Sequence, residues 1–84
     1  MVPQISLAQL VSIVRECAGD SDVHDLDSDI LDLTFADLGY DSLALLEISA
    51  KLEQDLGVSI PEDEIRTPRT TLRIINEKIA EEAA

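Results

Sequence analysis

The chain has 84 residues, with 18 acidic and 6 basic side chains and a formal net charge of −12. This length allows one small domain spanning residues 1–84, whose core must be aliphatic because the chain has a single Phe and a single Tyr. The charge argues against binding nucleic acid or an anionic membrane surface, and it favours partners with basic patches, which an acidic protein attracts.

Cysteine content and the N-terminus narrow the class of protein further. The single cysteine, Cys17, excludes an internal disulfide framework and a cysteine-based zinc site. It lies within an amphipathic helical pattern, so we expect a small buried side chain rather than a nucleophile. The first residues, Met1-Val2-Pro3-Gln4, lack the basic start and apolar run of a signal peptide. We therefore expect a cytoplasmic protein. We also expect it to be a monomer.

The first predicted helix covers about residues 6–18. Ser6 can cap it, and Gln9 three residues later completes a capping-box pattern. Apolar residues then recur at helical spacing on one face, at Leu7, Leu10, Val11, Val14, Cys17 and Ala18. Gly19 supplies the stop.

The connection from Asp20 to Tyr40 is rich in Asp and Ser and has no clear helical or strand pattern. A structureless segment of this length is unusual in a compact domain, so it must be pinned to the core. The apolar residues available for pinning are Leu26, Ile30, Leu31, Leu33, Phe35 and Leu38. The pattern also allows a short helical turn around Ile30–Leu33 or Phe35–Leu38.

The same acidic connection suggests a calcium site, because Asp25, Asp27 and Asp29 alternate as in an EF-hand loop. The pattern then fails. Ile30 stands where such a loop needs glycine, and Ala36 stands where it needs a glutamate. We therefore expect no calcium site and no other metal site.

The second predicted helix, about residues 42–56, carries two apolar stripes. The core stripe follows helical spacing through Leu45, Ile48, Leu52 and Leu56. The second stripe is rotated away from it and consists of Leu43, Leu46 and Ala50, on the side of Glu47, Glu53 and Gln54. A domain this small can hardly bury both stripes. We therefore predict that the second one is an exposed, acid-rimmed contact surface.

The rest of the chain predicts two more helices. Val58 to Pro61 is extended, because the residue before a proline is displaced from the α region. A short third helix is expected at about 61–65, and a last helix at about 68–82 follows the cap-then-proline pair Thr67-Pro68. The core stripe of the last helix is Leu72, Ile75, Ile79 and Ala83. Three long helices and one short helix predict an all-α fold, a small four-helix bundle with a long first loop.

One serine lies where the long loop becomes the second helix. Asp41 can cap this helix, which leaves Ser42 at the first helical position with its hydroxyl free. The unpaired N–H groups and the dipole at this end favour a negatively charged group such as a phosphate diester. A serine-nucleophile enzyme is the competing interpretation. It is disfavoured because the only histidine, His24, lies in the acidic loop and no Gly-x-Ser-x-Gly turn is present.

The residues around Ser42 also resemble a known family. The triplet Asp41-Ser42-Leu43 is similar to the 4'-phosphopantetheine attachment site of acyl carrier proteins. The longer run from Gly39 to Leu46, with Glu16-Cys17-Ala18-Gly19 upstream, most resembles the discrete carrier proteins of bacterial aromatic (type II) polyketide synthases. The resemblance implies a non-catalytic carrier whose Ser42 is joined covalently to 4'-phosphopantetheine from coenzyme A, with Asp41 and Leu43 beside it.

The resemblance further implies partners. A phosphopantetheinyl transferase, which needs coenzyme A and magnesium, would attach the arm, and the thiol of the arm would carry malonyl and growing polyketide chains. The other partners would be a ketosynthase–chain-length-factor pair, a malonyl acyltransferase and a ketoreductase. Each would place a basic patch of its own surface against the acidic second helix. The residues predicted for this contact are Leu43, Leu46, Glu47, Ala50 and Glu53.

Two alternatives stay open. A carrier for fatty-acid synthesis fits Glu47 and Glu53, but Gln54 stands where another acid is common. Tyr40 and the Glu-Cys-Ala-Gly run favour the polyketide group instead. The alternative from another class is an acidic interaction module without a prosthetic group, which would bind a partner through the second stripe.

Three residues of the last helix are candidates for contact with the cargo: Arg69, Leu72 and Asn76. Asn76 falls on the apolar stripe, where an amide is costly unless it is hydrogen-bonded. It bonds either to backbone within the protein, such as the long loop, or to a cargo chain that bears several carbonyls. Arg69 lies in the first helical turn, where the helix dipole disfavours a cation. A cation at this unfavourable position suggests a functional role.

Overall fold

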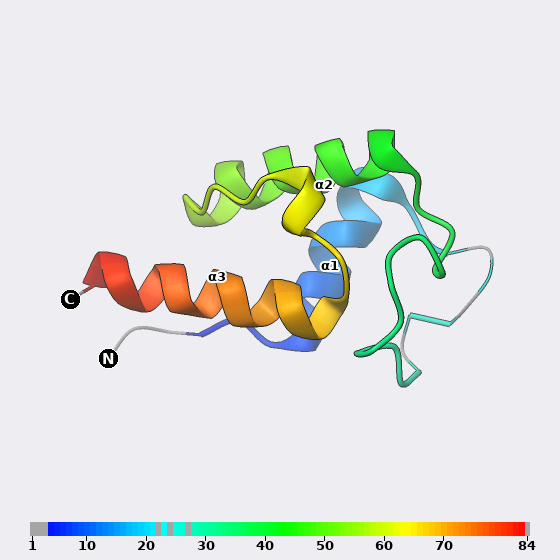
Figure 1. The fold of residues 1–84 in the computed structure, drawn as a ribbon, viewed down its shortest axis with the longest axis horizontal. Coiled ribbons are helices and arrows are strands. Elements are labelled where there is room, and N and C mark those ends of the chain that lie inside the picture. Colours follow the sequence, from blue (N-terminus) through cyan, green and yellow to red (C-terminus); the bar gives the residue numbers. More distant parts are fainter. Residues whose placement is uncertain (1–3, 22, 24, 27, 84) are drawn as a thin grey trace.

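The computed structural model describes residues 4–83 apart from 22, 24 and 27, and these residues form three α-helices and one 3-10 turn (Figure 1). The helices are α1 (Leu7–Ala18), α2 (Ser42–Leu56) and α3 (Pro68–Ala83), and the 3-10 turn is η1 (Glu62–Glu64). No strand occurs among these residues, which confirms the all-α prediction. Within the same residues, no helix combines the length and apolarity needed to cross a membrane.

The predicted four-helix bundle is not confirmed, because the short third segment is a 3-10 turn rather than an α-helix. The Glu64 N–H donates to the Pro61 carbonyl at 3.0 Å, and the Ile65 N–H donates to the Glu62 carbonyl at 3.1 Å. Ile65 then leaves the helical region, with ψ 86°, and buries its side chain, which is 2% exposed. The core contact of Ile65 therefore ends this segment before an α-helical turn is complete.

Local signals position the long helices as predicted. The Gln9 N–H donates to Ser6 Oγ, and the Ser6 N–H donates to Gln9 Oε1 at 2.7 Å, so the capping box at the start of α1 is present. Gly57 ends α2 in the left-handed conformation, with φ 69°. The α1 and α2 helices pack against each other, with α3 against α1. The core includes Leu10, Val11, Val14, Ile48, Leu52 and Ile75.

The long connection between α1 and α2 is pinned to the core by four of the six residues predicted to do so, the buried Leu26, Ile30, Phe35 and Leu38. Of the other two, Leu33 is partly buried and packs against the core, whereas Leu31 is partly buried outside the core cluster. Two backbone hydrogen bonds also tie the loop to the start of α3: the Phe35 N–H donates to the Arg66 carbonyl at 2.8 Å, and the Arg69 N–H donates to the Leu31 carbonyl at 3.1 Å. His24 and Asp27, which entered the enzyme and calcium alternatives, lie outside the described residues.

Candidate functional site

The start of α2 has the geometry predicted from the sequence. Asp41 is the N-cap, with extended backbone (φ −88°, ψ −176°), and its Oδ1 accepts a hydrogen bond from the Ala44 N–H at 2.9 Å. Ser42 is the first helical residue and is exposed. Its hydroxyl has no hydrogen-bond partner in the part of the chain that the structure describes. A free hydroxyl therefore stands at the positive end of a helix of 15 residues.

Tyr40 ties the approach to Ser42 to the end of α1, a role that the sequence did not reveal. Its side chain is 6% exposed, and its hydroxyl donates to the Gly19 carbonyl at 2.8 Å. Its ring meets that of Phe35 edge to face, with the ring centroids 6.2 Å apart. Gly39, the preceding residue, has φ 92°, a conformation that side-chain-bearing residues rarely adopt. These contacts hold the backbone that leads into α2.

The second stripe of α2 is exposed, as predicted. Leu43 is 63% exposed and Leu46 is 50% exposed, and Ala50 is exposed as well. Ile48 and Leu52, on the core stripe, are fully buried. We call Leu43, Leu46 and Ala50 the contact patch.

The charges on α2 are divided between its two sides. Glu47 and Glu53 are exposed and lie on the side of the contact patch. The only cation of this helix, Lys51, faces α1, where its Nζ is 3.6 Å from Glu16 Oε2 and 3.5 Å from Asp55 Oδ2. The charge of Asp55 is the main cause that raises the pKa of Lys51. Because Lys51 is engaged on the α1 side, the contact patch keeps its acidic rim.

An open hollow of about 320 Å³ lies beside α2, one helical turn from Ser42. Leu45 of α2 forms one wall, the loop residues Thr34 and Ala36 form another, and the segment around η1 closes the third side. Leu45 is only half-buried for this reason. The predicted cargo residues of α3 are not among the residues that line this hollow.

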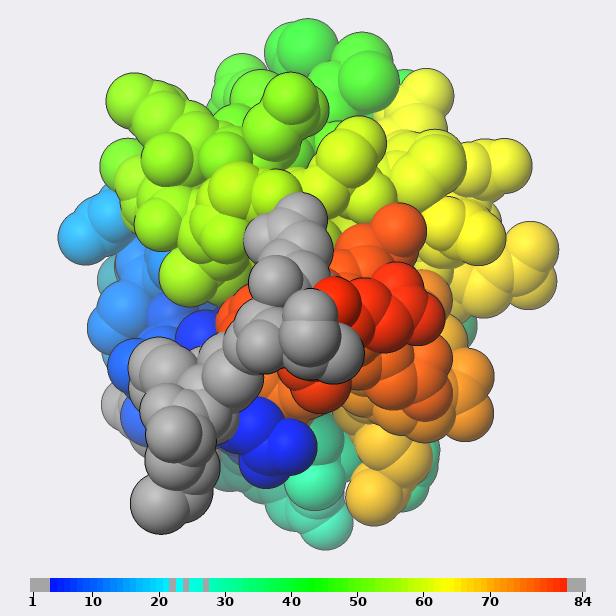
Figure 2. All heavy atoms as spheres, turned by 90° about the vertical axis from the view of Figure 1, so that its left-hand side faces the viewer, coloured from blue at the N-terminus to red at the C-terminus, as the bar shows by residue number. Residues whose placement is uncertain are grey.

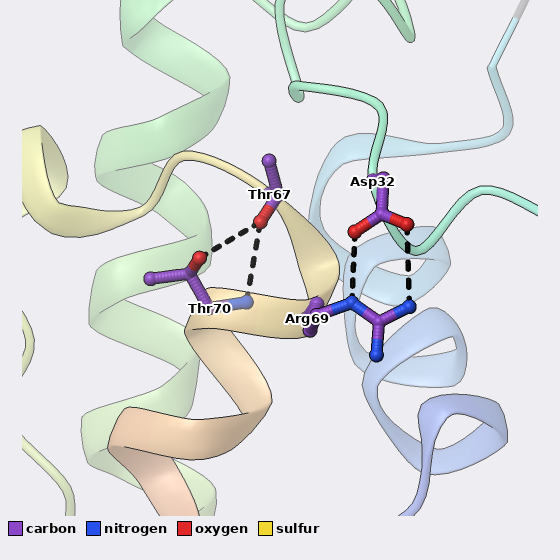
Figure 3. A network of polar contacts seen from close by, with 4 residues as sticks. All are labelled: Asp32, Thr67, Arg69 and Thr70. Atoms are coloured by element: carbon purple, nitrogen blue, oxygen red, sulfur yellow. Dashed lines mark hydrogen bonds and ion pairs between the residues drawn. The ribbon is translucent and has the colours of Figure 1, made fainter.

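Arg69 is paired with the long loop (Figure 3). Its Nε and Nη2 donate to the two carboxylate oxygens of Asp32 at 2.8 and 3.2 Å. The hydrogen bond from the guanidinium lowers the pKa of Asp32 below its usual value. Beside this pair, the Thr70 N–H donates to Thr67 Oγ1 at 3.2 Å at the start of α3. The Arg69 side chain therefore helps to hold the loop against the first turn of α3.

Asn76 is hydrogen-bonded to the N-terminal segment rather than to the loop. Its Oδ1 accepts from the Ile5 N–H at 2.9 Å, and its Nδ2 donates to the Ile5 carbonyl at 3.3 Å. Figure 2 shows this segment, in blue, against α3, in orange. Leu72 is partly buried and packs on the core. These contacts do not test the predicted cargo role, which stays a prediction.

Comparison with known proteins identifies the family. The family described as phosphopantetheine attachment site matches residues 8–75. The tetracenomycin polyketide synthase acyl carrier protein of Streptomyces glaucescens is 68% identical over 83 residues, which cover 99% of this chain and 100% of that protein. The chain belongs to the acyl carrier proteins of polyketide synthases.

Other carrier proteins of the family are similar in sequence and in structure. The actinorhodin polyketide synthase acyl carrier protein of Streptomyces coelicolor is 55% identical over 71 residues, covering 81% of this chain and 83% of the relative. The structure of the actinorhodin holo acyl carrier protein matches with a TM-score of 0.75 at 46% identity, over 96% of this chain and 98% of that one. Members of this family carry phosphopantetheine and are carrier subunits rather than catalysts, as the resemblance implied.

The thiol of the carrier protein itself, Cys17, is poorly suited to carry an acyl chain. It is partly buried in α1, and its Sγ lies 3.8 Å from the Val14 carbonyl oxygen. Burial raises its pKa above the ordinary value, so the group stays a protonated thiol near neutral pH. A reactive thiol is instead supplied by the prosthetic group when it is bound.

Proposed function

We propose that this carrier protein holds a 4'-phosphopantetheine arm on Ser42 Oγ and carries malonyl units and growing polyketide chains as thioesters on that arm. The observation that carries the proposal is the exposed hydroxyl of Ser42 at the first position of α2. In the attachment step, a bond forms from Oγ to the phosphorus next to pantetheine in coenzyme A. The pyrophosphate bond breaks, adenosine bisphosphate leaves, and the serine proton passes to the transferase. The helix dipole then stabilises the phosphodiester.

Incubation of the protein with a phosphopantetheinyl transferase, coenzyme A and magnesium tests this proposal. Intact-mass spectrometry should show the addition of a single arm, and fragmentation should place it on the peptide that contains Ser42. A protein that stays unmodified under conditions that convert a known carrier protein would support the alternative, an acidic interaction module without a prosthetic group.

The similarity to the relatives supports an aromatic polyketide rather than a fatty acid as the cargo. The 68% identity is to the carrier protein of tetracenomycin biosynthesis. The structure of a 3-oxo-butyl form of the actinorhodin carrier matches this chain with a TM-score of 0.80 at 46% identity. The partners are then the transferase, a ketosynthase–chain-length-factor pair, a malonyl acyltransferase and a ketoreductase. We propose that the protein works in the cytoplasm, as a monomer.

Glu47→Lys and Glu53→Lys should slow the transfer of acyl groups between the holo protein and these partners, mainly through a lower encounter rate. Both glutamates are exposed beside the contact patch, where a basic partner surface would be attracted. Transfer rates should be measured at several salt concentrations, since exposed charges are screened over about 10 Å at 0.1 M ionic strength. The wild-type rate should fall with salt more steeply than the rates of the variants.

Glu77→Lys is the matched control for these two substitutions. Glu77 is exposed on α3, and its replacement changes the net charge by the same amount. This variant should transfer acyl groups at nearly the wild-type rate. An equal loss in all three variants would show that net charge, rather than the surface beside the contact patch, controls docking.

We also propose that α3 contacts a polar cargo through Asn76, with Arg69 and Leu72 beside it. Asn76 uses one N–H and its oxygen on Ile5, and an amide has a second N–H that can donate to a cargo carbonyl. A bound alkyl chain would leave this donor unpaired, at a cost of about 1–3 kcal/mol. Arg69 can add a charge-assisted hydrogen bond while it stays next to Asp32.

The amide-proton shifts of holo protein loaded with a polar acyl mimic or with an alkyl chain test the cargo contact. The polar cargo should shift the signals around Arg69, Leu72 and Asn76 more strongly than the alkyl cargo does. Asn76→Leu should reverse this preference, with each unloaded holo protein as its own reference. If neither cargo shifts the signals of α3, Asn76 is only a structural amide.

A further inference from the structure

Three large apolar side chains are exposed among the residues that the structure describes: Val23, Leu43 and Leu46. Two of them belong to the contact patch on α2. The third, Val23, lies in the acidic loop and is 61% exposed, about as much as Leu43. Isolated apolar side chains are common on protein surfaces, so the position of Val23 relative to Ser42 decides whether it has a role.

The tertiary structure places Val23 beside Gly39, three residues before Ser42. The start of the loop runs alongside the segment that leads into α2, because Tyr40 donates to the Gly19 carbonyl and Ser21 Oγ donates to the Leu38 carbonyl. The Val23 N–H donates to Ser21 Oγ at 3.2 Å. These bonds join Gly19 and Ser21 to Tyr40 and Leu38, at opposite ends of the loop, and they tie Val23 to Ser21.

The side chain of Val23 lies directly over Gly39. A Cβ built on Gly39 would be 3.2 Å from Val23 Cγ2, which is tighter than most Cβ contacts, so a side chain at position 39 would displace the valine by a few tenths of an ångström. The φ of Gly39, 92°, also disfavours any other residue there. Gly39 precedes Ser42 by three residues, which span about 11 Å at most. The exposed Val23 side chain thus packs beside a glycine that lies three residues before the serine, where a larger residue would be disfavoured by its φ and crowded by the valine.

Resting on the proposed modification of Ser42, we propose that Val23 and the contact patch form one surface that the phosphopantetheinyl transferase covers. The transferase must bring a phosphorus atom of coenzyme A to Ser42 Oγ, so it has to contact the residues around this atom. Enzymes that act at the far end of a flexible arm can dock farther away. The partner surface that fits is an apolar area bordered by Lys and Arg, because Asp41 and Glu47 are exposed beside the apolar groups.

Substitutions at Val23 test this inference through the kinetics of modification. Val23→Asp should lower kcat/KM for the transferase by about tenfold or more, because an apolar contact is replaced by a charge that must be desolvated. Val23→Thr, which keeps the shape and loses one methyl contact, should lower it about threefold. The change should lie in KM rather than kcat, since Val23 does not touch the reacting atoms. Ala80→Asp adds the same charge at an exposed position of α3 and should be modified like the wild type.

A direct measurement separates docking from folding. In a titration of the Ser42→Ala protein with the transferase, the methyl signals of Val23 should shift together with those of Leu43 and Leu46. Unchanged kcat/KM in both Val23 variants, or methyl signals of Val23 that do not shift while those of Leu43 do, would overturn the inference. The proposed function would stand in that case, because it fails only if the wild-type protein is not modified at Ser42.

Discussion

Ser42→Ala should fold like the wild-type protein and accept no phosphopantetheine. Asp41, rather than Ser42, caps α2 through its bond to the Ala44 N–H, so the substitution removes no structural hydrogen bond. Thermal unfolding followed by circular dichroism should give a transition close to that of the wild type, whereas mass spectrometry after incubation with the transferase and coenzyme A should show only the apo mass.

The other serines of the chain provide the control for this result. Ser6, Ser21 and Ser49 are engaged in hydrogen bonds with the backbone. Ser59 is exposed, but it lies in an extended segment rather than at a helix start. Ser59→Ala should therefore be modified as fully as the wild type. Addition of an arm to the Ser42→Ala protein would place the attachment site elsewhere.

Leu52→Ala should lower the free energy of unfolding by about 2–5 kcal/mol, because it opens a cavity at a fully buried site. Leu46→Ala removes the same atoms from a side chain that is 50% exposed, so we expect a change of about 0.5 kcal/mol or less. Urea denaturation of the two variants measures both effects. Although Leu46→Ala should have the smaller effect on stability, it should impair acyl transfer to partner enzymes while the protein stays folded.

Each leucine variant serves as the control for the other, since they lie on the same helix and delete the same group. Equal destabilisation by the two substitutions would mean that the contact patch is packed against the protein. If Leu46→Ala transfers acyl groups at the wild-type rate, the patch is exposed but does not take part in docking.

Features set by neighbouring residues were predictable from the sequence. The capping box of Ser6 and Gln9, the cap at Asp41 and the helix end at Gly57 all depend on groups three or four residues apart. Helical geometry brings such groups together whatever the rest of the chain does. The division of α2 into a buried and an exposed stripe follows from the same periodicity. The cap at Asp41 leaves Ser42 exposed at the first helical position, as expected. The short segment around η1 was predicted less well, because the burial of Ile65 outweighs its local helix signals.

Only the tertiary structure decided which residues far apart in the sequence meet. Asn76 bonds to Ile5, 71 positions away, and Arg69 bonds to Asp32, 37 positions away. Neither partner could be chosen from the sequence, because an amide or a guanidinium has many acceptable partners and the chain path selects among them. The folding of the long loop also brings Val23 against Gly39, three residues before Ser42. Local spacing determined the position of Ser42 on its helix. The path of the loop, which is held by its buried apolar residues, determined which residues surround Ser42.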